Sequence, residues 1–142
     1  MAVSNEHEKL VQEILNWSRE TYDCSLLSIS YQCSLLHGSS PTPPINGFYP
    51  DVHITDLKNT FLLIGEAKTK GDLEQNHSKA QILGYLKYID NFVQNHTDAT
   101  CILVLATQWA MAGRAKGLLR GMIKREKLSL AKYHVLDQLS VI

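Results

Sequence analysis

The alternation of apolar and polar residues predicts two neighbouring strands in the middle of the chain. Residues 51–56 alternate, with Val52 and Ile54 apolar between polar neighbours, which is the period of a half-buried strand. Residues 57–59 supply a turn, and residues 60–68 form a nearly continuous apolar run that ends in charge. Such a run is typical of a buried strand whose last residues emerge at an edge of the core. The two strands and the turn predict a hairpin.

The pattern along the rest of the chain predicts three helices and three more strands. The helices are expected at residues 5–20, 73–94 and 109–127, and the strands within 24–37 and at 100–107 and 131–136. Residues 38–47 are rich in Gly, Ser and Pro and predict an irregular loop that delivers the chain to Asp51. The resulting order is α–β–β–β–α–β–α–β, which predicts an α/β fold.

The predicted hairpin brings charged side chains together at one end. Side chains alternate between the two faces of a strand, so Glu66 and Lys68 point one way and Ala67 the other. Because the short turn makes the strands antiparallel, Asp51 is expected across from Glu66 and Lys68. Two carboxylates this close repel each other unless one is protonated or a cation lies between them. Carboxylate and backbone oxygens, including the carbonyl of Ala67, favour Mg²⁺ or Mn²⁺.

This combination of groups indicates a reaction class. Lys68 can orient a water molecule or stabilise the charge that develops on a phosphate. Carboxylates, a divalent cation and an amine together suit the hydrolysis of a phosphodiester. In the following helix, Gln81 and Tyr85 are four residues apart and share a face. Gln81 is expected to reach a phosphate or a water beside Lys68, and the alternative is a surface glutamine next to a half-buried tyrosine.

Length and composition predict one domain over residues 1–142. The chain is 44% hydrophobic and 20% charged, which is ordinary for a globular protein, and its apolar runs are too short for a membrane span. The N-terminus is polar and shows no signal-peptide pattern. The three cysteines follow no metal-binding spacing and are expected to be core thiols. These features predict a cytoplasmic protein in a reducing compartment, without a membrane partner.

Charge is distributed unevenly although the formal net charge is zero. Residues 1–110 carry 7 Lys and Arg against 12 Asp and Glu, a balance of −5, and residues 111–142 carry 7 against 2, a balance of +5. The excess lies largely in the helix expected at 109–127. Its candidate phosphate contacts are Arg114, Lys116, Arg120 and Lys124. The alternative is a solvated helix face without a partner.

Three glycines spaced four apart, Gly113, Gly117 and Gly121, predict a face of the same helix that packs closely on another backbone.

The six histidines show no spacing typical of a zinc site. His53 is the one with a candidate role, because it follows Asp51 by two residues and is expected on the same strand face. It is predicted to approach a metal ion or a phosphate, and the alternative is a core or edge histidine bonded to a neighbour.

These motifs resemble a known family. Pro50-Asp51, a spacer of 14 residues and Glu66-Ala67-Lys68 resemble the PD-(D/E)XK nuclease superfamily. The sequence QILGY, with Gln81 and Tyr85, resembles the Gln-x-x-x-Tyr element of RecB-type exonucleases, and EAKTKGDLEQNHSKAQ resembles the VRR-type nuclease domains. The similar region covers roughly residues 47–89. The resemblance implies a restriction-endonuclease-like core, in which helices flank a mixed central sheet.

The resemblance also implies roles for individual residues. Asp51 and Glu66 hold Mg²⁺ or Mn²⁺, together with the carbonyl of Ala67. Lys68 aids the attacking water, and Gln81 positions water or phosphate. Tyr85 is expected to bind the substrate. The first helix of the superfamily often adds an acidic ligand, for which Glu13 is the candidate because it lies mid-helix near the apolar face, with Glu8 as the alternative.

The expected function is therefore a metal-dependent nuclease acting on DNA. The sequence shows no obvious target-reading domain, which favours a small stand-alone endonuclease, structure-selective or of broad specificity, in repair, recombination or defence. Cleavage of a duplex needs two centres, which favours a homodimer. Two alternatives stay open: a non-catalytic nucleic-acid-binding or assembly module with the same fold, and a nuclease directed at RNA.

Overall fold

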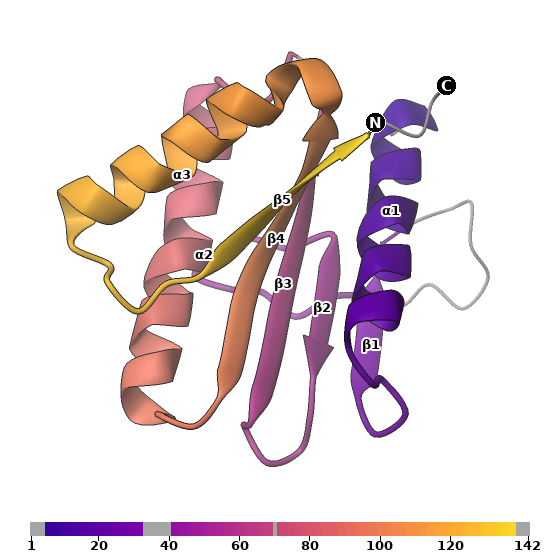
Figure 1. The fold of residues 1–142 in the computed structure, drawn as a ribbon, viewed down its shortest axis with the longest axis vertical. Helices are drawn as coiled ribbons and strands as arrows, with labels where there is room; N and C mark the ends of the chain where they lie inside the picture. The colour runs from indigo at the N-terminus through magenta and orange to yellow at the C-terminus, as the bar shows by residue number, and fades with distance from the viewer. Residues whose placement is uncertain (1–4, 33–40, 70, 139–142) are drawn as a thin grey trace.

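The computed structural model describes residues 5–32, 41–69 and 71–138 (Figure 1). Its elements in chain order are α1 (Asn5–Thr21), β1 (Ser28–Tyr31), β2 (Val52–Thr55), β3 (Phe61–Lys68), α2 (Asn76–Asn95), β4 (Thr100–Gln108), the 3-10 helix η1 (Trp109–Met111), α3 (Ala112–Glu126) and β5 (Tyr133–Gln138). Apart from η1, this is the order that the hydrophobic pattern predicts.

The five strands form one mixed sheet in the order β1-β2-β3-β4-β5. The first three are antiparallel to one another, and β3, β4 and β5 run parallel. The predicted hairpin of β2 and β3 is present, with Val52 opposite Gly65. A mixed sheet flanked by helices confirms the α/β class, while the restriction-endonuclease-like core stays a prediction.

Helices cover both faces of the sheet (Figure 1). One face packs on α1 through an apolar cluster that includes Ile14, Val52 and Leu63. The other face packs on α2 and α3 through a second cluster that includes Ile64 and Leu86. Alternate side chains of β3 therefore point to opposite faces of the sheet. Glu66 and Lys68 lie on the face that packs against α2.

Gly65 lets α1 approach the sheet closely. A Cβ atom at this position would lie 2.8 Å from Cγ2 of Ile14 and 2.8 Å from Cβ of Val52, which is closer than carbon atoms pack. The missing side chain thus forms a notch in β3 that receives the middle of α1. Through this contact, the position of α1 is tied to the strand that carries the candidate site.

The segment before Asp51 is more regular than its composition predicts. Ile45 and Phe48 exchange two backbone hydrogen bonds, of 2.7 and 3.0 Å, around a tight turn. The two central residues, Asn46 and Gly47, have φ values of 50° and 84°, which Asn-Gly pairs adopt readily. The turn leans on α2, where the Asn46 side chain donates to the carbonyl of Gly84 at 2.8 Å. Part of the predicted loop, residues 38–40, lies outside the described residues.

Several boundaries differ from the predictions. The strand expected within 24–37 is only the four residues of β1, and residues 33–37 lie outside the described part of the chain. The helix expected from residue 73 begins at Asn76, because Leu73 is buried in a preceding turn. The last strand starts at Tyr133, two residues later than expected, and extends to Gln138. The shift at α2 arises because a buried apolar side chain in a turn gives the same pattern as one in a helix.

The glycines of α3 do not pack on another backbone. Gly113 and Gly117 are exposed, and a Cβ atom at either position would meet nothing within 4 Å. A Cβ at Gly121 would meet only the side chain of Arg125. The prediction of a closely packed glycine face is therefore wrong, because α3 buries the opposite face through Ala115 and Leu119.

Among the residues that the structure describes, no helix combines the length and apolar character needed to cross a bilayer.

Candidate metal centre

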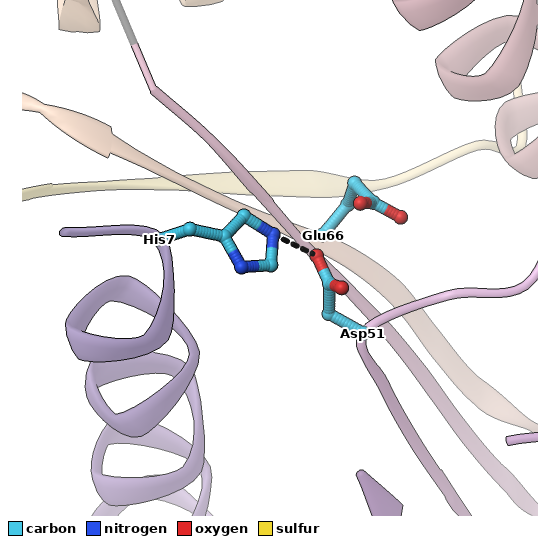
Figure 2. Close-up of side chains that lie close together, drawn as sticks. All are labelled: His7, Asp51 and Glu66. Carbon is cyan, nitrogen blue, oxygen red and sulfur yellow. Dashed lines mark hydrogen bonds and ion pairs between the residues drawn. The ribbon is translucent and has the colours of Figure 1, made fainter. Parts of the chain in front are cut away.

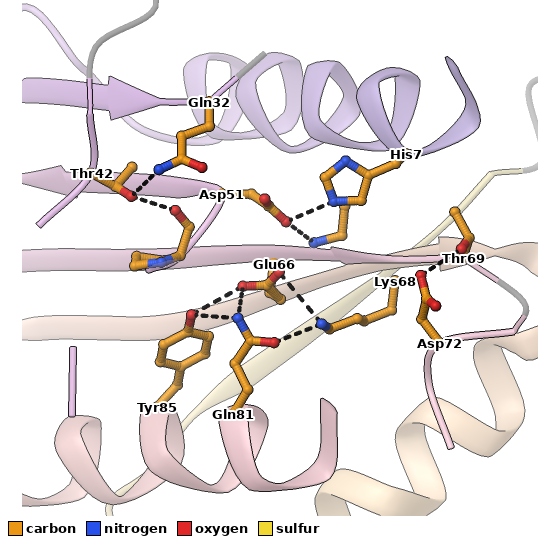
Figure 3. A network of polar contacts seen from close by, with 12 residues as sticks. His7, Gln32, Thr42, Asp51, Glu66, Lys68, Thr69, Asp72, Gln81 and Tyr85 are labelled. Carbon is orange, nitrogen blue, oxygen red and sulfur yellow. Dashed lines mark hydrogen bonds and ion pairs between the residues drawn. The ribbon is translucent and has the colours of Figure 1, made fainter. Parts of the chain in front are cut away.

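Several elements converge at one end of the sheet (Figure 1). Strands β3 and β4 both end there, and α1 and α2 both begin there. The convergence brings the first turns of two helices against the last residues of β3. Polar side chains from these segments meet in two adjoining groups that share Glu66 of β3 (Figure 3).

The first group consists of His7, Asp51 and Glu66 (Figure 2). His7 lies in the first turn of α1, Asp51 immediately precedes β2, and Glu66 belongs to β3. One potential ligand atom from each residue lies within 4.8 Å of the other two. Nε2 of His7 is 3.2 Å from Oδ2 of Asp51. A nitrogen and two carboxylate oxygens at this spacing can surround a single cation.

Backbone hydrogen bonds fix the position of Asp51. The N–H of Ala67 donates to Oδ2 of Asp51 at 2.9 Å, and the N–H of Gln32 donates to its carbonyl oxygen at 3.0 Å. Asp51 lies one residue before β2 rather than inside it, so its side chain is released from the strict alternation of the strand. It reaches the backbone of β3 and the side chain of His7 together (Figure 3). The predicted meeting of Asp51 with Glu66 is confirmed.

The second group is a network of buried hydrogen bonds around Glu66 (Figure 3). The amide of Gln81 donates to Oε1 of Glu66 at 3.0 Å and accepts a hydrogen bond from Nζ of Lys68 at 2.6 Å. The hydroxyl of Tyr85 lies 3.1 Å from the same oxygen of Glu66. Nζ of Lys68 is also 3.8 Å from Oε2 of Glu66. Gln81 therefore links the amine to the carboxyl group.

Burial and charge separate the pKa values of the two acidic groups. Burial, followed by the nearby carboxylate of Asp51, raises the pKa of Glu66 well above its usual range. Burial also pushes the pKa of Asp51 upward, but the hydrogen bond with His7 and other interactions outweigh it and leave the pKa below its usual range. The bond with Asp51 raises the pKa of His7. The arrangement favours an ionised Asp51 beside a protonated Glu66.

The structure brings together the four residues predicted to be catalytic and changes the expected role of Tyr85. Asp51, Glu66, Lys68 and Gln81 are all buried side chains of this centre. Tyr85 shares the face of Gln81 as predicted, but it is 0% exposed. A contact between Tyr85 and a substrate is therefore wrong for this conformation. Its hydroxyl instead holds Glu66 in place.

The contribution of α1 is His7, not the acidic residue expected from the resemblance. Glu13 is only half-buried and is not part of the group of ligand atoms. Glu8 is buried, but it is not part of that group either. A signal for His7 was present in the sequence: it precedes Leu10, Val11 and Ile14 at helical spacing, so it lies on the buried stripe of α1. Glu13 lies off that stripe.

His53 is not one of the grouped ligand residues. It pairs with Ile64 in the register of β2 and β3, which places it on the face of α2. Its side chain is half-buried, and this burial lowers its pKa. Asp51 precedes the strand, so the two residues do not share a strand face as expected. The approach of His53 to a metal ion or a phosphate stays a prediction.

The basic residues of α3 are all exposed, as a contact surface requires. The four predicted phosphate contacts among them are Arg114, Lys116, Arg120 and Lys124. Arg114 is nearest in sequence to the end of β4, and its guanidinium lies 3.1 Å from the carboxylate of Glu74. Lys124 follows ten residues later, which is about 15 Å further along the helix axis. Of the four, Arg114 is thus the one nearest along the chain to the end of β4.

A buried hydroxyl lies beside the amine of the network. Thr107 of β4 pairs with Lys68 in the sheet register, and its side chain is fully buried. Its Oγ1 has no hydrogen-bond partner among the described residues. Buried hydroxyls are normally hydrogen-bonded, so Oγ1 of Thr107 is an exception among the buried polar atoms of the described residues.

Comparisons of the chain with protein-family models, with curated proteins and with solved structures find no match. Function is therefore inferred from the side chains of the centre. These supply a set of ligand atoms for a cation, an adjoining amine, and an amide that joins the two.

Proposed function

We propose that this protein is a metal-dependent nuclease that hydrolyses phosphodiester bonds in DNA. The observation that carries the proposal is the convergence of His7, Asp51 and Glu66 on one point, with the amine of Lys68 next to Glu66. The Pro-Asp and Glu-Ala-Lys motifs that resemble the PD-(D/E)XK nucleases supply the two carboxylates and the amine. A centre with both ligands and an amine fits hydrolysis better than metal storage.

The ligand atoms fit Mn²⁺ or Mg²⁺. Two carboxylates suit either ion, whereas the imidazole of His7 favours the softer Mn²⁺. The carbonyl oxygen of Ala67, next to Glu66 in the chain, is proposed as a further ligand. Once bound, a divalent cation neutralises the pair of carboxylates and polarises a phosphodiester.

The remaining side chains position charge. Lys68 places its ammonium group beside the cluster, where it can stabilise negative charge on a phosphate oxygen. Gln81 accepts a hydrogen bond from Lys68 and donates one to Glu66, so it holds both side chains. Tyr85 holds Glu66 from the core side. The exposed cations of α3 are proposed to contact the phosphates of the nucleic acid, and a homodimer would supply the two centres that duplex cleavage needs.

Nicking of supercoiled plasmid in Mn²⁺ tests the proposal. Asp51→Asn, Glu66→Gln and Lys68→Met should each lower the rate by at least about 100-fold, as expected when a charge-stabilising group is removed. Glu13→Gln is the matched control, since it neutralises an acidic residue of α1 outside the ligand group and should leave the rate unchanged. Circular dichroism and urea unfolding verify that each variant folds. Full activity of folded Asp51→Asn or Lys68→Met would refute the centre.

A separate experiment must test whether the substrate is DNA or RNA, because carboxylates and a metal ion do not distinguish the two sugars. Matched DNA and RNA strands of one sequence should be cleaved at different rates by the same preparation. We expect faster cleavage of DNA. Faster cleavage of RNA would keep the metal chemistry and change the substrate class.

A second candidate function is a binding or assembly module without turnover. The observation that favours it is the internal pairing of the cluster, in which Lys68, Gln81 and Tyr85 all contact one another or Glu66. In that case the buried charges act as a structural ion-pair cluster. Such a protein would bind no divalent cation and would lose stability, rather than activity, when Lys68 is replaced.

A further inference from the structure

Two large aromatic side chains are exposed at the end of the sheet that carries the candidate metal centre. Tyr49 is 59% exposed and Trp109 is 63% exposed. Tyr49 precedes Asp51 by two residues, and Trp109 opens η1 directly after β4. Large aromatic rings contribute most when buried, so an exposed pair beside a polar centre indicates a contact surface.

The sheet register places the two aromatic residues on either side of β3. Lys68 pairs with Thr107, which precedes Trp109 by two residues in β4. On the other side Val52 pairs with Gly65, so the chain that leads into β2 runs beside the end of β3. Tyr49 therefore lies in the chain that leads into β2, and Trp109 directly follows β4, so the two residues adjoin the two strands that flank the end of β3.

The exposed aliphatic residues lie at the opposite end of the sheet. Among the described residues, the other exposed large hydrophobic side chains are Leu26, Leu57 and Leu130. Leu57 lies in the turn between β2 and β3, while Leu26 and Leu130 precede β1 and β5, which all start or turn at that end. Within the described part of the chain, the exposed large aromatic side chains thus lie only at the end with the candidate metal centre.

Electrostatic attraction alone gives this chain a low affinity for nucleic acid. Its formal net charge is zero, and Arg114, the candidate contact nearest the centre in the chain, is paired with Glu74. A protein that neutralises few phosphates binds weakly at physiological salt. Stacking of bases on aromatic side chains supplies affinity that does not depend on net charge.

We propose that Tyr49 and Trp109 stack on unpaired bases and thereby select single-stranded nucleic acid, or the single-stranded part of a branched structure. The faces of bases inside a duplex are covered by their neighbours, whereas unpaired bases offer them to a protein ring. This inference rests on the proposed nuclease function for its substrate class, and it specifies which form of nucleic acid reaches the centre.

Trp109 itself can report the contact. The other tryptophan, Trp17, stacks on His134 with ring centroids 4.6 Å apart, so Trp17→Phe keeps an aromatic ring there and leaves Trp109 as the single reporter. This protein is titrated in EDTA with an oligothymidylate of about 12 nucleotides and with a blunt duplex of the same length. The single strand should quench the fluorescence and bind at least about tenfold more tightly than the duplex.

Anisotropy of a labelled oligothymidylate then measures the contribution of each ring. Tyr49→Ala and Trp109→Ala should each weaken binding by about 5- to 150-fold, the range found when a stacking residue is removed. Leu57→Ala is the matched control, since it removes a fully exposed hydrophobic side chain from the far end. Wild-type affinity in both aromatic variants, or equal binding of single strand and duplex without quenching, would overturn the inference.

The two proposals fail in different ways. Binding is measured without metal, and cleavage is measured separately with Mn²⁺. Selective stacking without any cleavage supports the aromatic surface and contradicts the nuclease. Cleavage by wild-type protein, combined with wild-type binding by Tyr49→Ala and Trp109→Ala, contradicts the aromatic surface and supports the nuclease.

Discussion

The proton on Glu66 and the proton on His7 govern what the candidate metal centre can bind. Asp51 is ionised at ordinary pH because its pKa is lowered, whereas the pKa values of Glu66 and His7 are raised. A cation requires the imidazole nitrogen and the carboxylates in their deprotonated forms. Protons and a metal ion therefore compete for the same three side chains.

The expected consequence is metal binding that strengthens as pH rises. The pKa of His7 is raised above 6.5, so at lower pH its proton must leave before it ligates, and so must the proton of Glu66. Calorimetry at about pH 6 in buffers of different ionisation enthalpy should show net proton release when Mn²⁺ binds. His7→Asn should release fewer protons per Mn²⁺ than the wild-type protein. Identical proton release in both proteins would place the ion away from His7.

Strand β3 organises both layers of the molecule through the alternation of its side chains. Its residues on one side contact α1, and those on the other, including Glu66 and Lys68, contact α2. Gly65 is the point at which α1 comes closest to the strand. The distance between His7 and the acidic residues depends on this contact, because α1 is a rigid element whose first turn carries His7.

Gly65→Ala should therefore destabilise the protein. The added Cβ would lie 2.8 Å from Ile14 and Val52, and overpacking of this kind costs about 1–3 kcal/mol in the free energy of unfolding. Urea unfolding followed by circular dichroism measures the change. Gly117→Ala is the matched control, and it should change the free energy of unfolding in the opposite direction. Its position in α3 is open, and alanine should stabilise the helix by about 0.5–1 kcal/mol. Equal stability of Gly65→Ala and wild type would exclude close packing of α1 on β3.

At the scale of the whole molecule, one end of the sheet gathers the ends of four elements and the polar side chains that they carry. A ligand that binds only this assembled arrangement stabilises the folded state by mass action. The same end carries the exposed pair Tyr49 and Trp109, while the cores on the two faces of the sheet supply the rigid support.

Mn²⁺ should raise the melting temperature of the wild-type protein. At an ion concentration about 100 times the dissociation constant, the stabilisation is about 2.7 kcal/mol, which corresponds to a rise of roughly 5–11 °C for a chain of this size. Differential scanning fluorimetry measures the shift, and Asp51→Asn should show none. A wild-type protein that melts at the same temperature with and without Mn²⁺ would favour the structural ion-pair cluster over the nuclease.

The local parts of the fold and of the centre were predictable from sequence, and the contacts between layers were not. The hairpin followed from the alternation around Val52 and Ile54, and its short turn was enough to bring Asp51 to Glu66. The position of His7 beside Asp51 and Glu66 was not predicted, because it depends on the packing of α1 against β3, which are far apart in the sequence. The resemblance assigned Tyr85 to substrate binding, and helical spacing placed it on the face of Gln81, but neither shows how deeply that face is buried.

The amino-acid sequence by itself determined the order of the elements, the pairing of β2 with β3, and the meeting of two carboxylates with an amine. These features depend on alternation and short turns, which act between residues close together in the chain. Only the tertiary structure decided that His7 rather than Glu13 joins the acidic pair, and that Tyr49 and Trp109 flank the same end of the sheet. Such contacts depend on how α1 and the ends of distant strands pack, and packing is set by the complementary shapes of the assembled layers.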